Sequence, residues 1–84
     1  MKPGHPVIYT DSLRQDHNAI VTAVWGPDCV NLVYVSSDEN KTDSYGQQIE
    51  RNTSVVRYGE SNHYGCCFRE VGVEAHFEEH PVAN

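Results

Sequence analysis

The residues best suited to chemistry are cysteines and histidines in the C-terminal third of the chain. Four of them could act as zinc ligands: His63, Cys66, His76 and His80. Imidazole nitrogens and thiolates close a tetrahedron around structural zinc, and His76 and His80 would share one face of a helix. The spacing matches no standard zinc finger, and it leaves the thiol of Cys67 unused. We therefore expect no cofactor. Zinc is the one candidate, and core cysteines with surface histidines are the alternative.

The same cysteines could imitate a nucleophile. Cys66 or Cys67 lies close in sequence to His63, as in a cysteine–histidine pair. A working nucleophile also needs an orienting third group and an oxyanion hole, and the sequence indicates neither. The favoured interpretation is that Cys66 and Cys67 are buried or unreactive. Cys29 is expected to be a small packing residue within a strand. We predict that the chain is not an enzyme.

Arginines and aromatic residues could bind a ligand or a partner. Arg51, Arg57 and Tyr58 could form a cationic–aromatic spot for an anionic small molecule. Trp25, beside a Gly-Pro turn, and Tyr45, in a long polar loop, are the aromatic side chains most expected to be exposed. Small β barrels often bind through such aromatics. For most of the other aromatic residues, packing is the expected role.

The elements that must position these residues are strands. Residues 6–10 read as a short strand, and the segment from Asn18 to Ser36 gives the strongest signal. There, 18–25 and 29–35 are rich in β-branched residues and flank a Gly-Pro-Asp turn at 26–28. A helix is less favoured in either run because of that β-branched content and the intervening Gly-Pro.

Both strands of this hairpin carry apolar residues on both faces. In the first strand, Ala19, Val21, Ala23 and Trp25 are expected to share one face, opposite Ile20 and Val24. A flat sheet with one wet side would alternate more cleanly. The pattern fits a strongly bent sheet, a small barrel, or a face covered by another subunit.

The remaining segments complete a mostly β fold. We expect a polar loop at 37–47, a third strand best defined over 53–58, and a short strand at 66–68. Residues 74–79 are compatible with a helical turn or two that ends at Pro81. The prediction is a single domain, 1–84. It consists of an SH3-like barrel or roll of four to five antiparallel strands over about 5–68, with a C-terminal extension over 69–84.

Composition narrows the class of partner. Twelve carboxylates against six Lys and Arg give a formal charge of -6. A surface of this sign disfavours nucleic acid and anionic membranes. No apolar stretch approaches the roughly 20 residues of a membrane span, and no signal-like apolar segment follows Met1. Three cysteines, an odd number, make a disulfide framework unexpected and a reducing cytoplasm the default compartment.

Residues 5–58 resemble a family of small proteins encoded by tailed bacteriophages and prophages. The segments that carry the resemblance are Val7–Asp11, His17–Trp25, Asp28–Leu32 and Thr53–Val56. The resemblance implies an SH3-type barrel and a phage origin. The family has no established activity, so it supplies no catalytic residues to carry over.

These observations favour a non-enzymatic phage accessory or structural protein that binds a protein partner as a homo-oligomer. It would reside in the host cytoplasm or in the virion. One alternative is a counter-defence protein that binds an anionic, nucleotide-like small molecule through Arg51, Arg57 and Tyr58. The other is an interaction module stapled by zinc.

Overall fold

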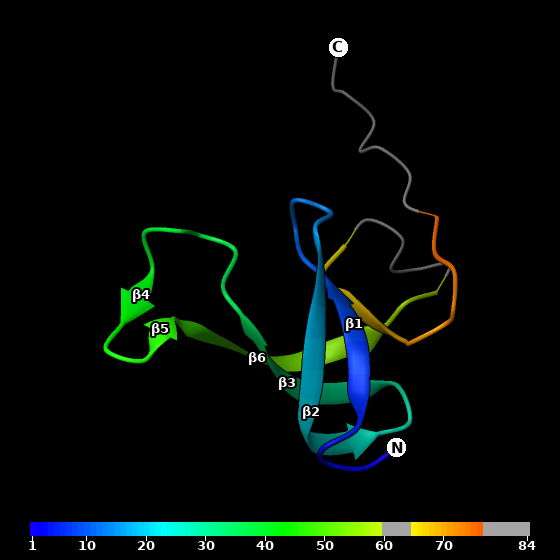
Figure 1. Ribbon diagram of the computed structural model, residues 1–84. Coiled ribbons are helices and arrows are strands. Elements are labelled where there is room, and N and C mark those ends of the chain that lie inside the picture. Colours follow the sequence, from blue (N-terminus) through cyan, green and yellow to red (C-terminus); the bar gives the residue numbers. More distant parts are fainter. Residues whose placement is uncertain (60–64, 77–84) are drawn as a thin grey trace.

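The computed structural model describes residues 1–59 and 65–76, and within these residues every regular element is a strand (Figure 1). The bounds of the strands are β1 Pro6–Thr10, β2 Asp16–Gly26, β3 Cys29–Val35, β4 Thr42–Asp43, β5 Gly46–Gln47, β6 Ile49–Arg57 and β7 Cys67–Glu70. None of the described residues forms a helix long and apolar enough to cross a membrane.

Five of the strands close into a barrel in the order β1-β2-β3-β6-β7, which confirms the predicted small SH3-like barrel. β7 closes it by pairing antiparallel with β1 and parallel with β6. The parallel pair departs from the expected all-antiparallel arrangement, because β7 enters the sheet by a crossing connection rather than through a hairpin turn. That pair is short and joins only Val56 to Cys67 and Arg57 to Phe68.

The predicted hairpin is present as β2 and β3, but two bulges interrupt its register. They lie between Val21 and Ala23 and between Val24 and Gly26. Each bulge adds a residue to β2 and shifts the alternation of its side chains. Val24 therefore packs against the core, and Trp25 lies outside it at 65% exposure. The expectation that Ala23 and Trp25 share one face with Ala19 and Val21 was therefore wrong.

The core fills the barrel with side chains from all five of its strands. Phe68 and Val30 have no exposed surface, and the rest of the buried cluster surrounds them. Its other members are Val7, Tyr9, Ala19, Val21, Leu32 and Val55. Small apolar side chains at alternate strand positions fill so narrow an interior efficiently.

The long polar segment between β3 and β6 holds a small hairpin of its own. β4 and β5 pair over Thr42–Asp43 and Gly46–Gln47. Figure 1 shows this hairpin at the far end of β6, away from the rest of the barrel. At the other end of the chain, residues 74–76 are not helical, and the remainder of the expected helical turn lies outside the described residues.

Candidate functional site

The candidate site is the outer face of β2, β3 and β6. We define it by the side chains that point away from the core on these strands: Asn18, Ile20, Thr22, Ala23, Trp25, Asn31, Val33, Val35, Ile49, Arg51 and Thr53. Register places Ile20, Val33 and Arg51 side by side across the three strands. Val35 and Ile49 form the next pair.

Several apolar side chains of this outer face are about half exposed. The exposed fractions are 51% for Ile20, 54% for Val35 and 50% for Ile49. Trp25, near the far end of β2, is 65% exposed. Isolated exposed apolar residues are common on any protein surface. Adjacent ones on neighbouring strands form a contiguous patch, which is the feature that marks interaction surfaces.

Asn31 holds Trp25 in place on this face. The indole Nε1 of Trp25 donates a hydrogen bond to Asn31 Oδ1 over 2.8 Å. The same oxygen accepts from the backbone N–H of Ser54 over 2.9 Å, where β6 takes a positive φ of 54°. One amide oxygen therefore fixes both the tryptophan and the irregular step of β6. The prediction that Trp25 is exposed is confirmed.

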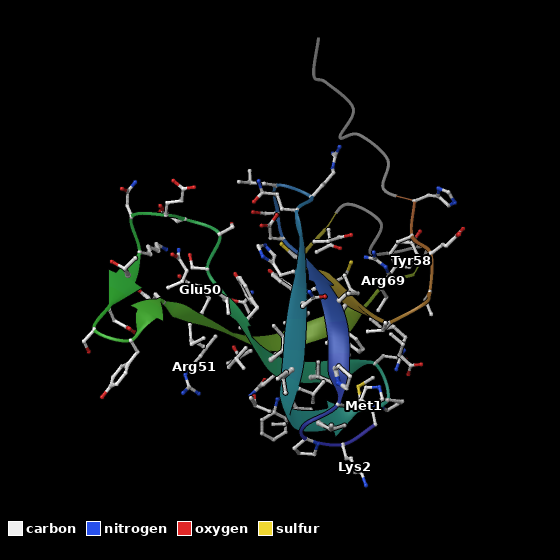
Figure 2. The ribbon with its side chains drawn as sticks, viewed as in Figure 1. Met1, Lys2, Glu50, Arg51, Tyr58 and Arg69 are labelled. Atoms are coloured by element: carbon white, nitrogen blue, oxygen red, sulfur yellow. The ribbon has the colours of Figure 1, made fainter. Side chains whose placement is uncertain are left out.

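Two charged side chains lie on the outer face. They are Arg51 and, at the first residue of β2, Asp16, which pairs with Arg69 over 2.9 Å. Away from that end of β2, no residue of the defined set is Asp or Glu. Among the described residues Arg51 makes no ion pair or side-chain hydrogen bond, whereas its neighbour Glu50 pairs with Lys41 over 3.4 Å. Figure 2 shows the side chains of Glu50 and Arg51 leaving β6 in opposite directions. The face therefore combines apolar side chains with uncharged polar ones, and its cation, Arg51, has no partner among the described residues.

The structure does not bring Arg51 together with Arg57 and Tyr58. Arg57 lies six residue steps along β6 from Arg51, roughly 20 Å at the usual rise of a strand. Figure 2 shows Arg51 and Tyr58 on opposite sides of the molecule. The predicted anionic spot is thus divided between two regions.

Arg57 and Tyr58 are engaged in holding the barrel together. The Arg57 guanidinium bonds Asp28 Oδ1 over 2.9 Å, pairs with Glu70 over 3.7 Å, and lies 4.9 Å above the ring centroid of Phe68. The Tyr58 hydroxyl accepts from the His76 N–H and donates to the His76 carbonyl. These contacts tie the end of β6 to the turn before β3 and to the C-terminal segment.

Tyr45 is as exposed as predicted, at 98%, and stands at the turn between β4 and β5. Its backbone N–H donates to Asp43 Oδ1 over 2.8 Å, which shapes the turn. The β4–β5 hairpin that carries Tyr45 precedes the start of β6 and lies apart from the barrel strands (Figure 1).

Two of the four candidate zinc ligands, His63 and His80, lie outside the described residues. Cys66 is exposed with a positive φ of 56°, and the backbone of His76 holds Tyr58. In the part of the chain that the structure describes, no three His, Cys, Asp or Glu side chains are grouped to hold a metal ion.

A polar cluster at one end of the barrel was missed by sequence reasoning. His17 Nε2 lies 2.8 Å from Asp11 Oδ2, and the imidazole packs 4.5 Å from the ring of Tyr34 and 6.0 Å from that of Tyr9. Asp11 Oδ1 accepts from the amides at positions 13 and 15. An aspartate that bonds the backbone just beyond it is a common turn signal, but its pairing with His17 depends on β2 beginning at Asp16.

Ionisation in this region follows burial and hydrogen bonding. Burial opposes the charge of Asp11, yet hydrogen bonds from His17 and from two backbone amides outweigh it, so the pKa of Asp11 is lowered. Burial, followed by the nearby Cys66 thiol, raises the pKa of Tyr9. Burial also raises the pKa of Cys67 to about 11, which keeps it a neutral thiol at pH 7. The cluster braces the β1–β2 turn.

Comparison with protein families, with curated proteins and with solved structures finds no match to this chain.

Proposed function

We propose that this chain is a non-enzymatic protein-binding module that acts through the outer face of β2, β3 and β6. The supporting observation is the cluster of half-exposed Ile20, Val35 and Ile49 around Val33, on a face whose acidic residue, Asp16, lies at the start of β2 and is paired with Arg69. Burying such side chains against a partner is worth about 25 cal/mol per Å² of apolar area. A tryptophan held in a fixed orientation by Asn31 adds an anchor of the type that dominates binding energy.

The setting proposed for this module is a phage accessory or structural role, in the host cytoplasm or in the virion. It rests on the sequence resemblance of residues 5–58 alone. Self-association through the same face, as a homo-oligomer, is one form of the proposed binding. It accounts for apolar residues on both sides of β2 and β3.

A photo-cross-linking amino acid placed on the outer face tests this function. It replaces Val33, at the centre of the face, and in a matched variant it replaces Thr42 on the β4–β5 hairpin. We expect the position-33 variant to form discrete cross-linked products in the cells that make the protein. The position-42 variant should not form those products.

Light scattering on the same variants separates the two forms of binding. A cross-linked product of twice the chain mass, with a concentration-dependent oligomer, would identify self-association. A heavier product of another mass would identify a different protein. Equal cross-linking at positions 33 and 42, or none at either, would reject the outer face as a binding surface.

A further inference from the structure

The outer face ends at an open strand edge. β6 pairs with β3 along one side from Ile49 to Val56, but on its other side it pairs with β7 only at Val56 and Arg57. Over Ile49–Asn52 the register with β3 is continuous, so this part of the edge is regular. Among the described residues no strand pairs with this edge at positions 49–55.

The hydrogen bonds of the β3–β6 ladder show which peptide groups face outward. The Ser36 N–H donates to the Gln48 carbonyl over 2.8 Å. Narrow and wide pairs alternate along an antiparallel ladder, so Val35 and Ile49 form a wide pair, and so do Val33 and Arg51. The N–H and C=O groups of Ile49 and Arg51 therefore point away from β3, toward the open side.

Edges of this type are usually protected by bulges, prolines or charges. The second half of β2, which also lacks a second strand partner, has two bulges and precedes Pro27. The Ile49–Asn52 edge has neither a bulge nor a proline. The outward charge here is that of Arg51, which has no counter-ion among the described residues.

We propose that β6 receives an extended peptide of a partner protein as an added strand, with a carboxylate of that peptide opposite Arg51. The inference rests on the proposed protein-binding function and names the chemistry of the partner. Main-chain hydrogen bonds to Ile49 and Arg51 give affinity in this mode, and side chains at alternate positions give specificity. Opposite charges facing each other across two strands stabilise the pair.

A second copy of this chain fits the edge less well. In an antiparallel pair around a twofold axis, residues that face each other lie on the same side of the sheet. Glu50 points to the side opposite Arg51, so it cannot meet the partner's arginine. Ile49 and Thr53, the residues of β6 that share the side of Arg51, carry no carboxylate, so no register of two β6 edges places an acid opposite Arg51. An axis centred on Arg51 would also place two arginines together, and one centred on Glu50 would place two carboxylates together. Charge complementarity therefore favours a foreign peptide with an acidic residue among β-branched ones.

Random-peptide display on the purified full chain tests the proposal. Selection is run on the wild type, on Arg51→Glu, and on Lys2→Glu, which makes the same charge change far from the edge. The wild type and Lys2→Glu should enrich peptides that carry Asp or Glu between β-branched residues two positions away on each side. Arg51→Glu should enrich Lys or Arg there instead, and it should bind the acidic peptides about tenfold more weakly.

Amide exchange with a selected acidic peptide bound locates the contact. We expect the amides of Ile49 and Arg51 to gain protection from exchange. Equal enrichment on wild type and Arg51→Glu, no enriched peptide, or unchanged exchange at these amides would overturn the proposal. If the free chain formed a dimer that protects the same amides, the edge would bind a second copy of the chain. That result would also overturn the proposal. Peptides that perturb Ile20 and Val33 without protecting the edge would refute strand addition alone and leave the outer face as a binding surface.

Discussion

At the scale of single residues, polar side chains in this small protein mostly hold strands and turns in place. Asn31 fixes Trp25 and the irregular step at Ser54 with one oxygen. Arg69 donates hydrogen bonds to Thr10 Oγ1 over 3.0 Å and to Asp16 Oδ2 over 2.9 Å. These bonds join β7 to β1 and β2. The side chain of Arg51 has no partner among the described residues, which is also true of Lys2 and Arg14. Arg51 differs from those two in its position, because it lies beside Val33 on the outer face. An unpaired cation at that position is the feature of this scale that favours a binding role.

Two aspartates at the β1–β2 turn, Asp11 and Asp16, make the free energy of unfolding depend on pH in the acid range. The pKa of Asp11 is lowered, as described above, and hydrogen bonds from Arg69 and then Thr10 outweigh burial to lower that of Asp16. A carboxylate whose pKa is lower in the folded state than in the unfolded state stabilises the fold. This stabilisation is complete above the unfolded-state pKa, near 3.9. That contribution is lost as the pH falls through the folded-state pKa.

We therefore expect the free energy of unfolding to fall as the pH drops below about 4. Asp11→Asn should flatten this acid limb, because the amide no longer titrates beside His17 but can still accept from the turn amides. Urea unfolding across the acid range measures both slopes. Asp43→Asn is the matched control, because Asp43 sits on the exposed β4–β5 hairpin. An acid limb that is equally steep in Asp11→Asn and wild type would contradict the assignment.

At the scale of elements, the sequence predicted the strands better than their irregularities. The strand at 6–10 and the hairpin strand at 29–35 agree with β1 and β3, because β-branched runs end there at turn residues. The β2 bulges were not predictable, since a period of two residues carries no mark of an inserted residue. The β4–β5 hairpin was missed because its strands, Thr42–Asp43 and Gly46–Gln47, are short, polar and free of buried apolar residues.

The candidate site was predictable only in part. The turn beside Trp25 and the polarity around Tyr45 indicated exposure, and both are exposed. The grouping of Arg51 with Arg57 and Tyr58 rested on closeness in sequence, and an extended strand separates such residues along its length. The open edge at Ile49 depends on how β7 pairs with β6, which is a tertiary property that the sequence pattern does not encode.

The entry into β7 depends on one glycine. Gly65 has a φ of 114°, and a Cβ at this position would overlap the backbone carbonyl oxygen of Asp11. Gly65→Ala therefore adds a backbone clash to the strain of a left-handed conformation. We expect a loss of about 2 kcal/mol or more in the free energy of unfolding.

Gly72→Ala is the matched control for this prediction. Gly72 has a φ of 95°, but no atom lies within 4 Å of where its Cβ would be. Only the conformational strain applies there, so the expected loss is about 1 kcal/mol. Urea denaturation of both variants measures the difference. Equal losses would show that β7 can enter the sheet without the close approach of Gly65 to Asp11.

At the scale of the whole molecule, the last strand completes a very small core. Phe68 is fully buried among side chains from the other barrel strands, and the Arg57 guanidinium lies over its ring. A domain of this length has only about 4–13 kcal/mol of total stability. Truncating a buried phenylalanine to alanine costs about 3–5 kcal/mol, so Phe68→Ala should remove a large share of the stability of the fold.

Because one core unites all five strands, the effect of Phe68→Ala should reach Trp25 on β2, which does not belong to the core. Thermal unfolding followed by far-ultraviolet circular dichroism and by Trp25 fluorescence should give coincident transitions, both shifted down together. Phe68→Leu keeps most of the volume and should shift them less. If the fluorescence transition stayed at its wild-type temperature while the circular dichroism changed, β7 would be a separable element. The β2–β3–β6 sheet would then carry its outer face without a closed barrel.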